Sequence, residues 1–302
     1  MLENIVQTDK LLPLGIMQIM QLKELYSLGK DNLSRNAIET PGLEAYILLS
    51  ESEVIDNLSE VYAHPEKEVD RETINKFQNL LERRVKKEPI AYIIGEKEFY
   101  SKPYKVNPSV LIPRPETELL VDETLELAKQ IGSPLVLEIG TGSGCIAVTL
   151  AAYCNQAKIV ASDISQRALN VAKENVNKHS QNDKITLTKA DMLSSFKNDS
   201  FDIVVSNPPY ITETEFDLLD PEVKDFEPKI ALTGGKDGLC YIKEIISDST
   251  RVLKDGGWCV LEIGYNQRKE VENIFTDCEF IDISSTKDLN GIERVIKAKW
   301  KK

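Results

Sequence analysis

The apolar residues in the first third of the chain recur at the spacing of amphipathic helices. The first such stripe, which we expect Gly29 to end, consists of Leu14, Met17, Leu22, Leu25 and Leu28. Thr40 followed by Pro41 predicts the start of a second helix, with apolar positions at Ala45, Ile47, Leu48 and Leu49. Asp70 is expected to cap a third helix, whose apolar face comprises Ile74, Phe77, Leu81 and Val85. Residues 1–88 are therefore predicted to form a helical bundle, and we assign substrate docking to it.

Residues 89–115 show a different pattern, in which short β-prone runs are broken by glycine and proline. The runs are Ala91–Ile94, Phe99-Tyr100 and Tyr104–Val106, and the breaks are Gly95, Pro103 and Pro108. We expect a hairpin-like connector here, ending at Pro113-Arg114-Pro115.

From Glu116 onward, helical and strand patterns alternate along the chain. Glu116–Ile131 has helical spacing, and the strands predicted after it are Leu135–Ile139, Lys158–Ser162, Ile185–Thr188, Phe201–Ser206, Trp258–Ile263, Phe280–Ser284 and Gly291–Lys297. Such alternation predicts an α/β domain over residues 116–302 with a parallel, doubly wound sheet.

Composition narrows the classes of function. The 302 residues include 37 Lys and Arg against 49 Asp and Glu, a net charge of −12, which argues against a surface built to bind nucleic-acid phosphates. The sequence has no apolar run long enough for a membrane span, and its start lacks a signal peptide pattern. Five scattered cysteines and two histidines give no metal-binding spacing. We expect a cytoplasmic monomer with reduced thiols, no metal, and neither a membrane nor a nucleic-acid partner.

A glycine-rich loop follows the first predicted strand of the α/β domain. This loop has the sequence Glu138-Ile139-Gly140-Thr141-Gly142-Ser143-Gly144. Its glycines let the chain turn sharply, and because they lack side chains, a ligand can approach the backbone closely before a helix begins. A dinucleotide fingerprint, G-x-G-x-x-G, would place its third glycine at position 145, where Cys145 stands instead. The loop is thus typical of a ligand without a pyrophosphate, although a plain tight turn is the alternative.

Acidic residues follow the next two predicted strands. Asp163 stands where a carboxylate can accept hydrogen bonds from both ribose hydroxyls of a nucleoside, and Asp191-Met192 could contact an adenine amine and ring. Taken singly, these are ordinary turn residues. At the carboxyl ends of adjacent parallel strands, they line a crevice that suits an adenosine-bearing ligand. Because the glycine loop lacks the spacing that binds a pyrophosphate, this ligand is expected to be S-adenosylmethionine rather than NAD.

The strand Phe201–Ser206 ends at Asn207-Pro208-Pro209-Tyr210. Two prolines stiffen this corner and prevent further ladder hydrogen bonds. The Asn207 side-chain oxygen and the Pro208 carbonyl would be two fixed acceptors, which match the two N–H donors of a planar –NH₂ group. The Tyr210 ring could cover that group and exclude water.

The chain resembles the release factor glutamine methyltransferases, the PrmC/HemK family. Besides the glycine loop, Asp163 and the Asn207–Tyr210 corner, the matching blocks are Arg83-Arg84, Glu88–Ile93, Val110–Glu118, Phe226-Glu227-Pro228, Ala231-Leu232, Gly234–Leu239, Asp288-Leu289 and Gly291–Arg294. The resemblance implies a Rossmann-like, seven-stranded S-adenosylmethionine-dependent methyltransferase domain.

The resemblance also implies the activity: methylation of the glutamine side-chain amide in the Gly-Gly-Gln motif of peptide chain release factors. It assigns the methyl donor to Glu138, Ile139, Gly140, Thr141, Gly142, Asp163, Met192 and Asn207. To these we add Gly144 from the glycine loop and Asp191 from the strand-end pattern. The resemblance assigns the glutamine to Asn207, Pro208, Pro209 and Tyr210, with Asn207, Pro208 and Tyr210 as the catalytic residues. No chemistry is assigned to three charged residues that lie within the matching blocks, Arg114, Glu227 and Arg294.

Two other classes of function share some of these features. Enzymes that methylate the exocyclic amine of adenine or cytosine in nucleic acid also bind a planar –NH₂ group, but they must flip a base and grip a phosphate backbone. The net negative charge and the N-terminal helical region argue against that reading. A non-catalytic sensor of S-adenosylmethionine would have no use for two aligned amide acceptors.

Overall fold

The computed structural model describes residues 19–302 of the chain. The described residues divide into two compact units, of which the first ends at Ile94 and the second is Gly95–Lys302. Among the described residues, every helix is too short or too polar to traverse a bilayer. Leu14 and Met17, which belong to the first predicted stripe, lie outside the described residues.

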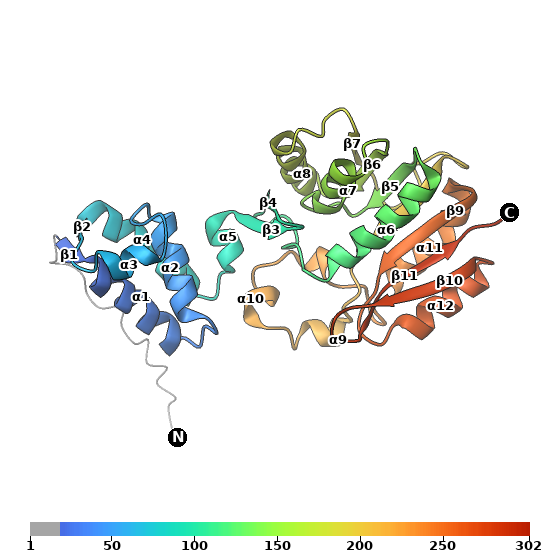
Figure 1. Cartoon of the computed structure of the whole chain (residues 1–302). Helices are drawn as coiled ribbons and strands as arrows, with labels where there is room; N and C mark the ends of the chain where they lie inside the picture. Colours follow the sequence, from blue (N-terminus) through green and yellow to red (C-terminus); the bar gives the residue numbers. More distant parts are fainter. Residues whose placement is uncertain (1–18) are drawn as a thin grey trace, which may run out of the picture. The chain divides into compact units, whose positions relative to one another are not determined.

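The first unit is helical, with one short antiparallel strand pair (Figure 1). Its elements are β1 (Ile19–Gln21), α1 (Leu22–Arg35), α2 (Pro41–Glu51), α3 (Ser59–Ala63), β2 (Glu68–Asp70), α4 (Arg71–Val85) and α5 (Ile90–Ile94). Helices α1, α2 and α4 contact one another and bury a shared apolar core that includes Leu25, Leu48 and Phe77. Asp70 caps α4 as predicted, since its carboxylate accepts a hydrogen bond from the Thr73 N–H at 3.0 Å.

Gly29 lies inside α1, so the prediction that it ends this helix was wrong. Its lack of a side chain serves packing: a Cβ atom built at Gly29 would lie 2.5 Å from Cζ of Phe77. The glycine therefore lets the Phe77 ring of α4 approach the backbone of α1, and the helix continues to Arg35.

The run Ala91–Ile94, predicted as β-prone, is helical in α5. Pro89 begins the turn, because its carbonyl accepts the N–H groups of Tyr92 and Ile93. Three consecutive residues of α5, Ala91, Tyr92 and Ile93, are buried, which a half-exposed strand would not allow. The actual hairpin is shorter than predicted: β3 (Glu96–Phe99) pairs with β4 (Lys102–Lys105).

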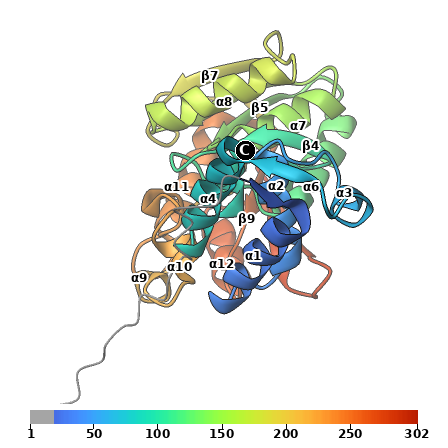
Figure 2. The ribbon, with the colours of Figure 1, turned by 90° about the vertical axis from the view of Figure 1, so that its left-hand side faces the viewer.

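The second unit is built on a seven-stranded sheet in the order β10-β11-β9-β8-β5-β6-β7. Its strands are β5 (Leu135–Ile139), β6 (Lys158–Asp163), β7 (Ile185–Lys189), β8 (Phe201–Ser206), β9 (Leu253–Glu262), β10 (Ile281–Lys287) and β11 (Glu293–Lys299). All seven predicted strands are present. Figure 2 shows β7 at one edge of this sheet, beside α8 (Gln166–Lys178).

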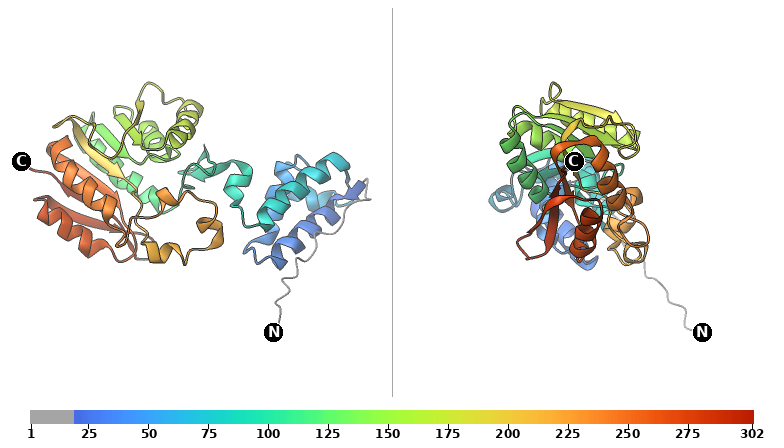
Figure 3. Two further views of the ribbon diagram at one scale, coloured as in Figure 1. Left: turned by 180° about the vertical axis from the view of Figure 1, so that it is seen from behind. Right: turned by 90° about the vertical axis from the view of Figure 1, so that its right-hand side faces the viewer.

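Helices cover both faces of the sheet because nearly all its central side chains are apolar. One face, with Val136 and Val205, packs against α6 (Thr117–Ile131), α7 (Cys145–Tyr153) and α8. The other face, with Leu137 and Val204, packs against α11 (Cys240–Val252) and α12 (Arg268–Asp277), which are orange and red in the left panel of Figure 3. The α/β class predicted from sequence is confirmed.

The sheet is mixed, so the prediction of a wholly parallel sheet was wrong. Strand β11 runs antiparallel to both β9 and β10. The cause is the short connection after β10, where Asp288 accepts backbone hydrogen bonds from Asn290 and Ile292 in a tight turn. A parallel strand would have needed a crossover of a dozen or more residues.

The strand order reverses at β5. The chain passes from β5 to β6 and β7 on one side, and then crosses to β8 on the other side of β5. The two crossovers leave in opposite directions, which opens a crevice at the carboxyl ends of β5 and β8. Between β8 and α11 the chain forms the short segments α9 (Glu213–Phe216), α10 (Pro221–Lys224) and η1 (Lys229–Ala231).

Candidate active site

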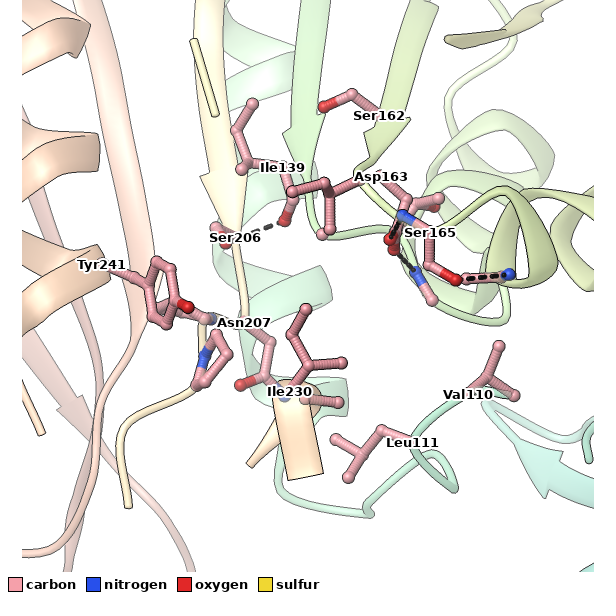
Figure 4. A pocket seen from close by; sticks show the side chains of 18 of the residues that line it. Val110, Leu111, Ile139, Ser162, Asp163, Ser165, Ser206, Asn207, Ile230 and Tyr241 are labelled. Atoms are coloured by element: carbon pink, nitrogen blue, oxygen red, sulfur yellow. Dashed lines mark hydrogen bonds between the residues drawn. The ribbon is translucent and has the colours of Figure 1, made fainter. Parts of the chain in front are cut away.

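A cavity of about 470 Å³ lies at this crevice, within the range of small-molecule sites. The strand ends of β5, β6 and β8 form one part of its wall, and the segments around Ser109–Arg114 and Pro228–Ala231 form another. In Figure 4, Asp163 and Asn207 lie on different sides of this space, with Ile230, Leu111 and Val110 along its lower side.

The glycine loop after β5 exposes its backbone to the cavity. Gly140 and Gly142 have φ angles of 72° and 53°, which L side chains rarely adopt, and both line the cavity. Apart from each glycine and its chain neighbours, no atom of residues 19–302 lies within 4 Å of a Cβ built at either position, so open space adjoins the backbone there. Gly144 does not line the cavity; its built Cβ would lie 3.2 Å from Cβ of Ala172 in α8, so this glycine serves helix packing.

Asp163, at the end of β6, ties the glycine loop to the next loop. Its Oδ2 accepts a hydrogen bond from the Gly142 N–H at 2.9 Å, and its Oδ1 accepts one from the Ser165 N–H at 2.8 Å. Burial raises the pKa of Asp163, whereas these backbone hydrogen bonds lower it. Each carboxylate oxygen retains a lone pair that can accept a ligand hydroxyl.

Glu138 does not line the cavity, although the sequence placed it with the ligand-binding residues. Its side chain is wholly buried, and Oε2 accepts a hydrogen bond from the Thr141 hydroxyl at 2.8 Å. Burial raises the pKa of Glu138 to about 8. Since Thr141 does line the cavity, Glu138 supports the glycine loop from behind.

Asp191 and Met192 both line the cavity beyond the end of β7. Met192 has a φ of 49°, so the chain turns back at this residue, and its side chain packs against the apolar cluster that contains Leu137. Glu244 of α11 also lines the cavity. Burial raises the pKa of Glu244, and repulsion from Asp248 and Asp191 adds to that rise.

The corner after β8 contributes Asn207, Pro208 and Pro209 to the cavity wall. The Asn207 Nδ2 group donates a hydrogen bond to Thr117 Oγ1 at 3.1 Å. Tyr210 does not line the cavity; its hydroxyl donates to Glu262 Oε1 at 3.2 Å. The tyrosine ring thus lies behind the corner in this structure rather than over the cavity.

Two glycines and a glutamine pack tightly against the corner from the other side. A Cβ built at Gly234 would lie 2.5 Å from the Pro209 carbonyl oxygen, and one built at Gly238 would lie 2.3 Å from the Tyr210 carbonyl oxygen. Gln267 Nε2 donates a hydrogen bond to the same Tyr210 oxygen at 3.1 Å. These contacts immobilise the backbone of the corner.

Three charged residues that the sequence left without a role hold loops in place. The Arg114 guanidinium donates to Glu227, and the second oxygen of Glu227 accepts the Ile112 N–H at 3.1 Å. This buried carboxylate joins the segments on which Arg114 and Pro228 line the cavity. Arg294 donates to Asp288 Oδ2 at 3.0 Å and so braces the turn between β10 and β11.

Comparisons with known proteins agree with this geometry. Residues 24–95 match the family model of the PrmC N-terminal domain, and residues 115–220 match that of the methyltransferase small domain. The release factor glutamine methyltransferase of Caulobacter vibrioides is 38% identical over 277 residues, covering 92% of this chain and 96% of the relative. That of Clostridium botulinum is 38% identical over 282 residues, covering 93% and 99%. The chain belongs to the release factor glutamine methyltransferase family.

This membership confirms the resemblance recognised in the sequence. The α/β unit of this family member also resembles a methyltransferase from Pyrococcus furiosus in fold, with a TM-score of 0.51 and 17% identity, over 74% of this chain and 100% of that one.

Sequence reasoning missed several residues of the site in this member of the release factor glutamine methyltransferase family. The cavity wall also includes Ser109, Val110, Leu111, Pro113 and Arg114 of the connector and Pro228, Ile230 and Ala231. Several of these residues stand in the matching blocks, but their own patterns are those of ordinary loops and gave them no role in the site. Glu262 had a usable signal, because it is a carboxylate directly after the apolar run Cys259–Leu261 at the end of a strand, just as Asp163 stands at the end of β6. Thr117 lies in the matching block Val110–Glu118, but its own pattern gave it no task, because a threonine in the first turn of a helix is common.

Proposed function

We propose that this protein transfers a methyl group from S-adenosylmethionine to the side-chain amide nitrogen of the glutamine in the Gly-Gly-Gln motif of release factors. The observation that carries the proposal is the rigid corner at Asn207, Pro208 and Pro209, which lines the same cavity as the glycine loop and Asp163. Membership in the release factor glutamine methyltransferase family supports the choice of substrate.

The residues present fit the methyl donor. The open space beside Gly140 and Gly142 suits a ligand that approaches the bare backbone closely, and the half-buried Asp163 carboxylate suits the ribose hydroxyls. Asp191 and Met192 would lie near the adenine, and Ile139 and Thr141 would line the remaining wall. When bound, S-adenosylmethionine supplies an electrophilic methyl group on its sulfonium.

Asn207 and Pro208 would hold the glutamine amide. An amide nitrogen is a weak nucleophile, so the enzyme must chiefly orient it. Asn207 Oδ1 and the Pro208 carbonyl oxygen would each accept one N–H of the glutamine –NH₂ group, which aims the nitrogen. Correct orientation of two reactants lowers the activation free energy by about 7–11 kcal/mol relative to their free encounter in solution. These acceptors also stabilise the positive charge that develops on nitrogen, and the proton leaves to water or through them after methyl transfer.

The test is one incubation with labelled S-adenosylmethionine and either a release factor, the same factor with its Gly-Gly-Gln glutamine replaced by alanine, duplex DNA or no acceptor. The proposal expects label only in the unaltered release factor. Label in DNA would instead indicate an exocyclic-amine methyltransferase, and binding without transfer to any acceptor would indicate a sensor.

Asn207→Ala tests the assignment of the corner. Loss of one fixed acceptor should lower turnover about a hundredfold or more, while affinity for the methyl donor stays within about tenfold by calorimetry. Asn170→Ala, at an exposed position of α8, is the matched control and should retain full activity. Full activity in Asn207→Ala would refute the assignment.

We also propose that residues 1–88 dock the release factor, that the protein acts as a monomer, and that it works in the cytoplasm. The match to the PrmC N-terminal domain supports the docking role, and five unpaired cysteine thiols suit a reducing compartment. Tyr62, which is 70% exposed, is a large side chain available for such contact. Tyr62→Ser should raise the KM for the release factor and leave kcat and donor affinity unchanged.

A further inference from the structure

Thr117, which lines the cavity, and Glu262, which does not, both contact the Asn207–Tyr210 corner, and the proposed function gives neither of them a task. Thr117 is the first residue of α6, and Glu262 is the last residue of β9, which pairs with β8. The Thr117 hydroxyl lies 2.7 Å from Glu262 Oε2, and both side chains are buried. Thr117 Oγ1 is also the atom that receives the Asn207 Nδ2 hydrogen bond.

The chemistry of these three groups sets the direction of each hydrogen bond. At a pH above about 7, where Glu262 is ionised and can only accept, the single hydroxyl proton of Thr117 points to Glu262 Oε2. Thr117 Oγ1 can then only accept from Asn207, which requires the NH₂ end of the Asn207 amide to face it. The amide oxygen Oδ1 faces away, and among the described residues no donor contacts it. Figure 4 shows the Asn207 side chain at the cavity wall.

The same carboxylate holds the other end of the corner. Glu262 Oε1 accepts the Tyr210 hydroxyl at 3.2 Å, while Oε2 holds Thr117. One buried side chain therefore connects to both Asn207 and Tyr210, and the two prolines between them limit backbone motion.

We propose that Thr117 and Glu262 are positioning residues that orient the Asn207 amide, and that they thereby select a ligand group bearing two N–H donors. If the amide turned by 180°, its NH₂ would face the –NH₂ of the bound ligand, donor against donor, and the ligand would lose an acceptor. The inference deepens the proposed function, because it explains how this site prefers a carboxamide nitrogen to a hydroxyl.

Thr117→Val and Thr117→Ser separate orientation from packing. Valine keeps the shape of threonine and removes the hydroxyl, whereas serine keeps the hydroxyl and removes the methyl group. Thr124→Val in the same helix is the matched control, since the Thr124 hydroxyl is also buried and donates only to the Leu120 carbonyl. The three variants are compared with the wild type for kcat and KM with release factor, and for the calorimetric affinity of S-adenosylhomocysteine.

Thr117→Val should lower kcat about a hundredfold, the usual effect of a misplaced reacting group, with product affinity within about threefold of wild type. Thr117→Ser should recover kcat to within about threefold, and Thr124→Val should match the wild type. Equal losses in Thr117→Val and Thr117→Ser would show that Thr117 serves packing alone and would overturn the proposal.

A second measurement does not depend on turnover. The side-chain amide signal of Asn207 in ¹⁵N-labelled protein can be assigned by its loss in Asn207→Ser. Its hydrogen exchange should be slow in the wild type and in Thr117→Ser, and at least about tenfold faster in Thr117→Val, because an unbonded amide is accessible to water. Equal exchange in all three proteins would overturn the inference. If exchange behaves as expected but no release factor is methylated, the proposed function fails and the positioning role stands.

Discussion

Replacing Glu262 with glutamine should stabilise the protein at neutral and higher pH. Glu262 is wholly buried at the end of β9. Burial raises the pKa of its carboxyl from the usual 4.5 to about 7, although the Thr117 and Tyr210 hydroxyls and the Arg294 charge lower it and Glu116 raises it slightly. The ionised carboxylate is therefore less favourable in the folded protein than in the unfolded chain.

The direction and size of the effect follow from these two values. Below pH 4.5 the carboxyl is protonated in both states, so folding carries no ionisation cost. As pH rises to about 7, the unfolded chain releases this proton and the folded protein does not, so stability falls. A difference of about 2.5 in pKa, at about 1.4 kcal/mol for each pKa unit, gives a limiting cost of about 3.5 kcal/mol well above pH 7, and slightly less near pH 8.

Glutamine has no charge to bury, and its amide oxygen can still accept the Thr117 hydroxyl. Glu262→Gln should thus equal the wild type near pH 4.5 and exceed it by about 3 kcal/mol near pH 8. Urea unfolding followed by tryptophan fluorescence measures this, because both tryptophans, Trp258 and Trp300, lie in the second unit. Glu270→Gln, at an exposed position of α12, is the matched control.

The refuting result is a difference in unfolding free energy between Glu262→Gln and the wild type that is the same at every pH. It would mean that Glu262 ionises in the folded protein as readily as in the unfolded chain. A pH-dependent difference that Glu270→Gln shares would also count against the reasoning, because the effect would then not depend on burial.

Three further substitutions have expected outcomes. Asp163→Asn should weaken S-adenosylhomocysteine binding about tenfold or more in calorimetry, because the new NH₂ group would face a backbone N–H that now donates to a carboxylate oxygen. Gly29→Ala should lower the unfolding free energy of the first unit: the overpacking cost of about 1–3 kcal/mol against the fully buried Phe77 ring exceeds the roughly 1 kcal/mol gain in helix propensity. Asp70→Ala should cost about 1 kcal/mol in urea unfolding followed by far-ultraviolet circular dichroism, which reports the helices of the first unit, since α4 loses its N-cap hydrogen bond.

Much of the site could be predicted because its residues stand at strand ends. Asp163 follows a β-prone apolar run, and Asn207 with its prolines follows another, so each is recognisable from its immediate neighbours. Parallel strands bring their carboxyl ends to one edge of a sheet, which places such residues together without further information. The cavity wall indeed contains both.

Other features depended on partners far along the chain. Gly29 resembles a helix end until Phe77 is known to pack against it, and Thr117 resembles any helix-starting threonine until Glu262, 145 residues later, accepts its hydroxyl. The antiparallel direction of β11 likewise depended on how the short turn after β10 is braced.

By itself, the sequence determined the family, the order of helices and strands, and the strand-end residues of the site, since periodicity and turn chemistry are properties of adjacent residues. Only the tertiary structure decided that Glu138 and Tyr210 lie behind the cavity, that Arg114 and Glu227 join its walls, and that Thr117 and Glu262 orient the corner. The reason is physical: a hydrogen bond between distant residues depends on the packing of every element between them, which no local pattern encodes.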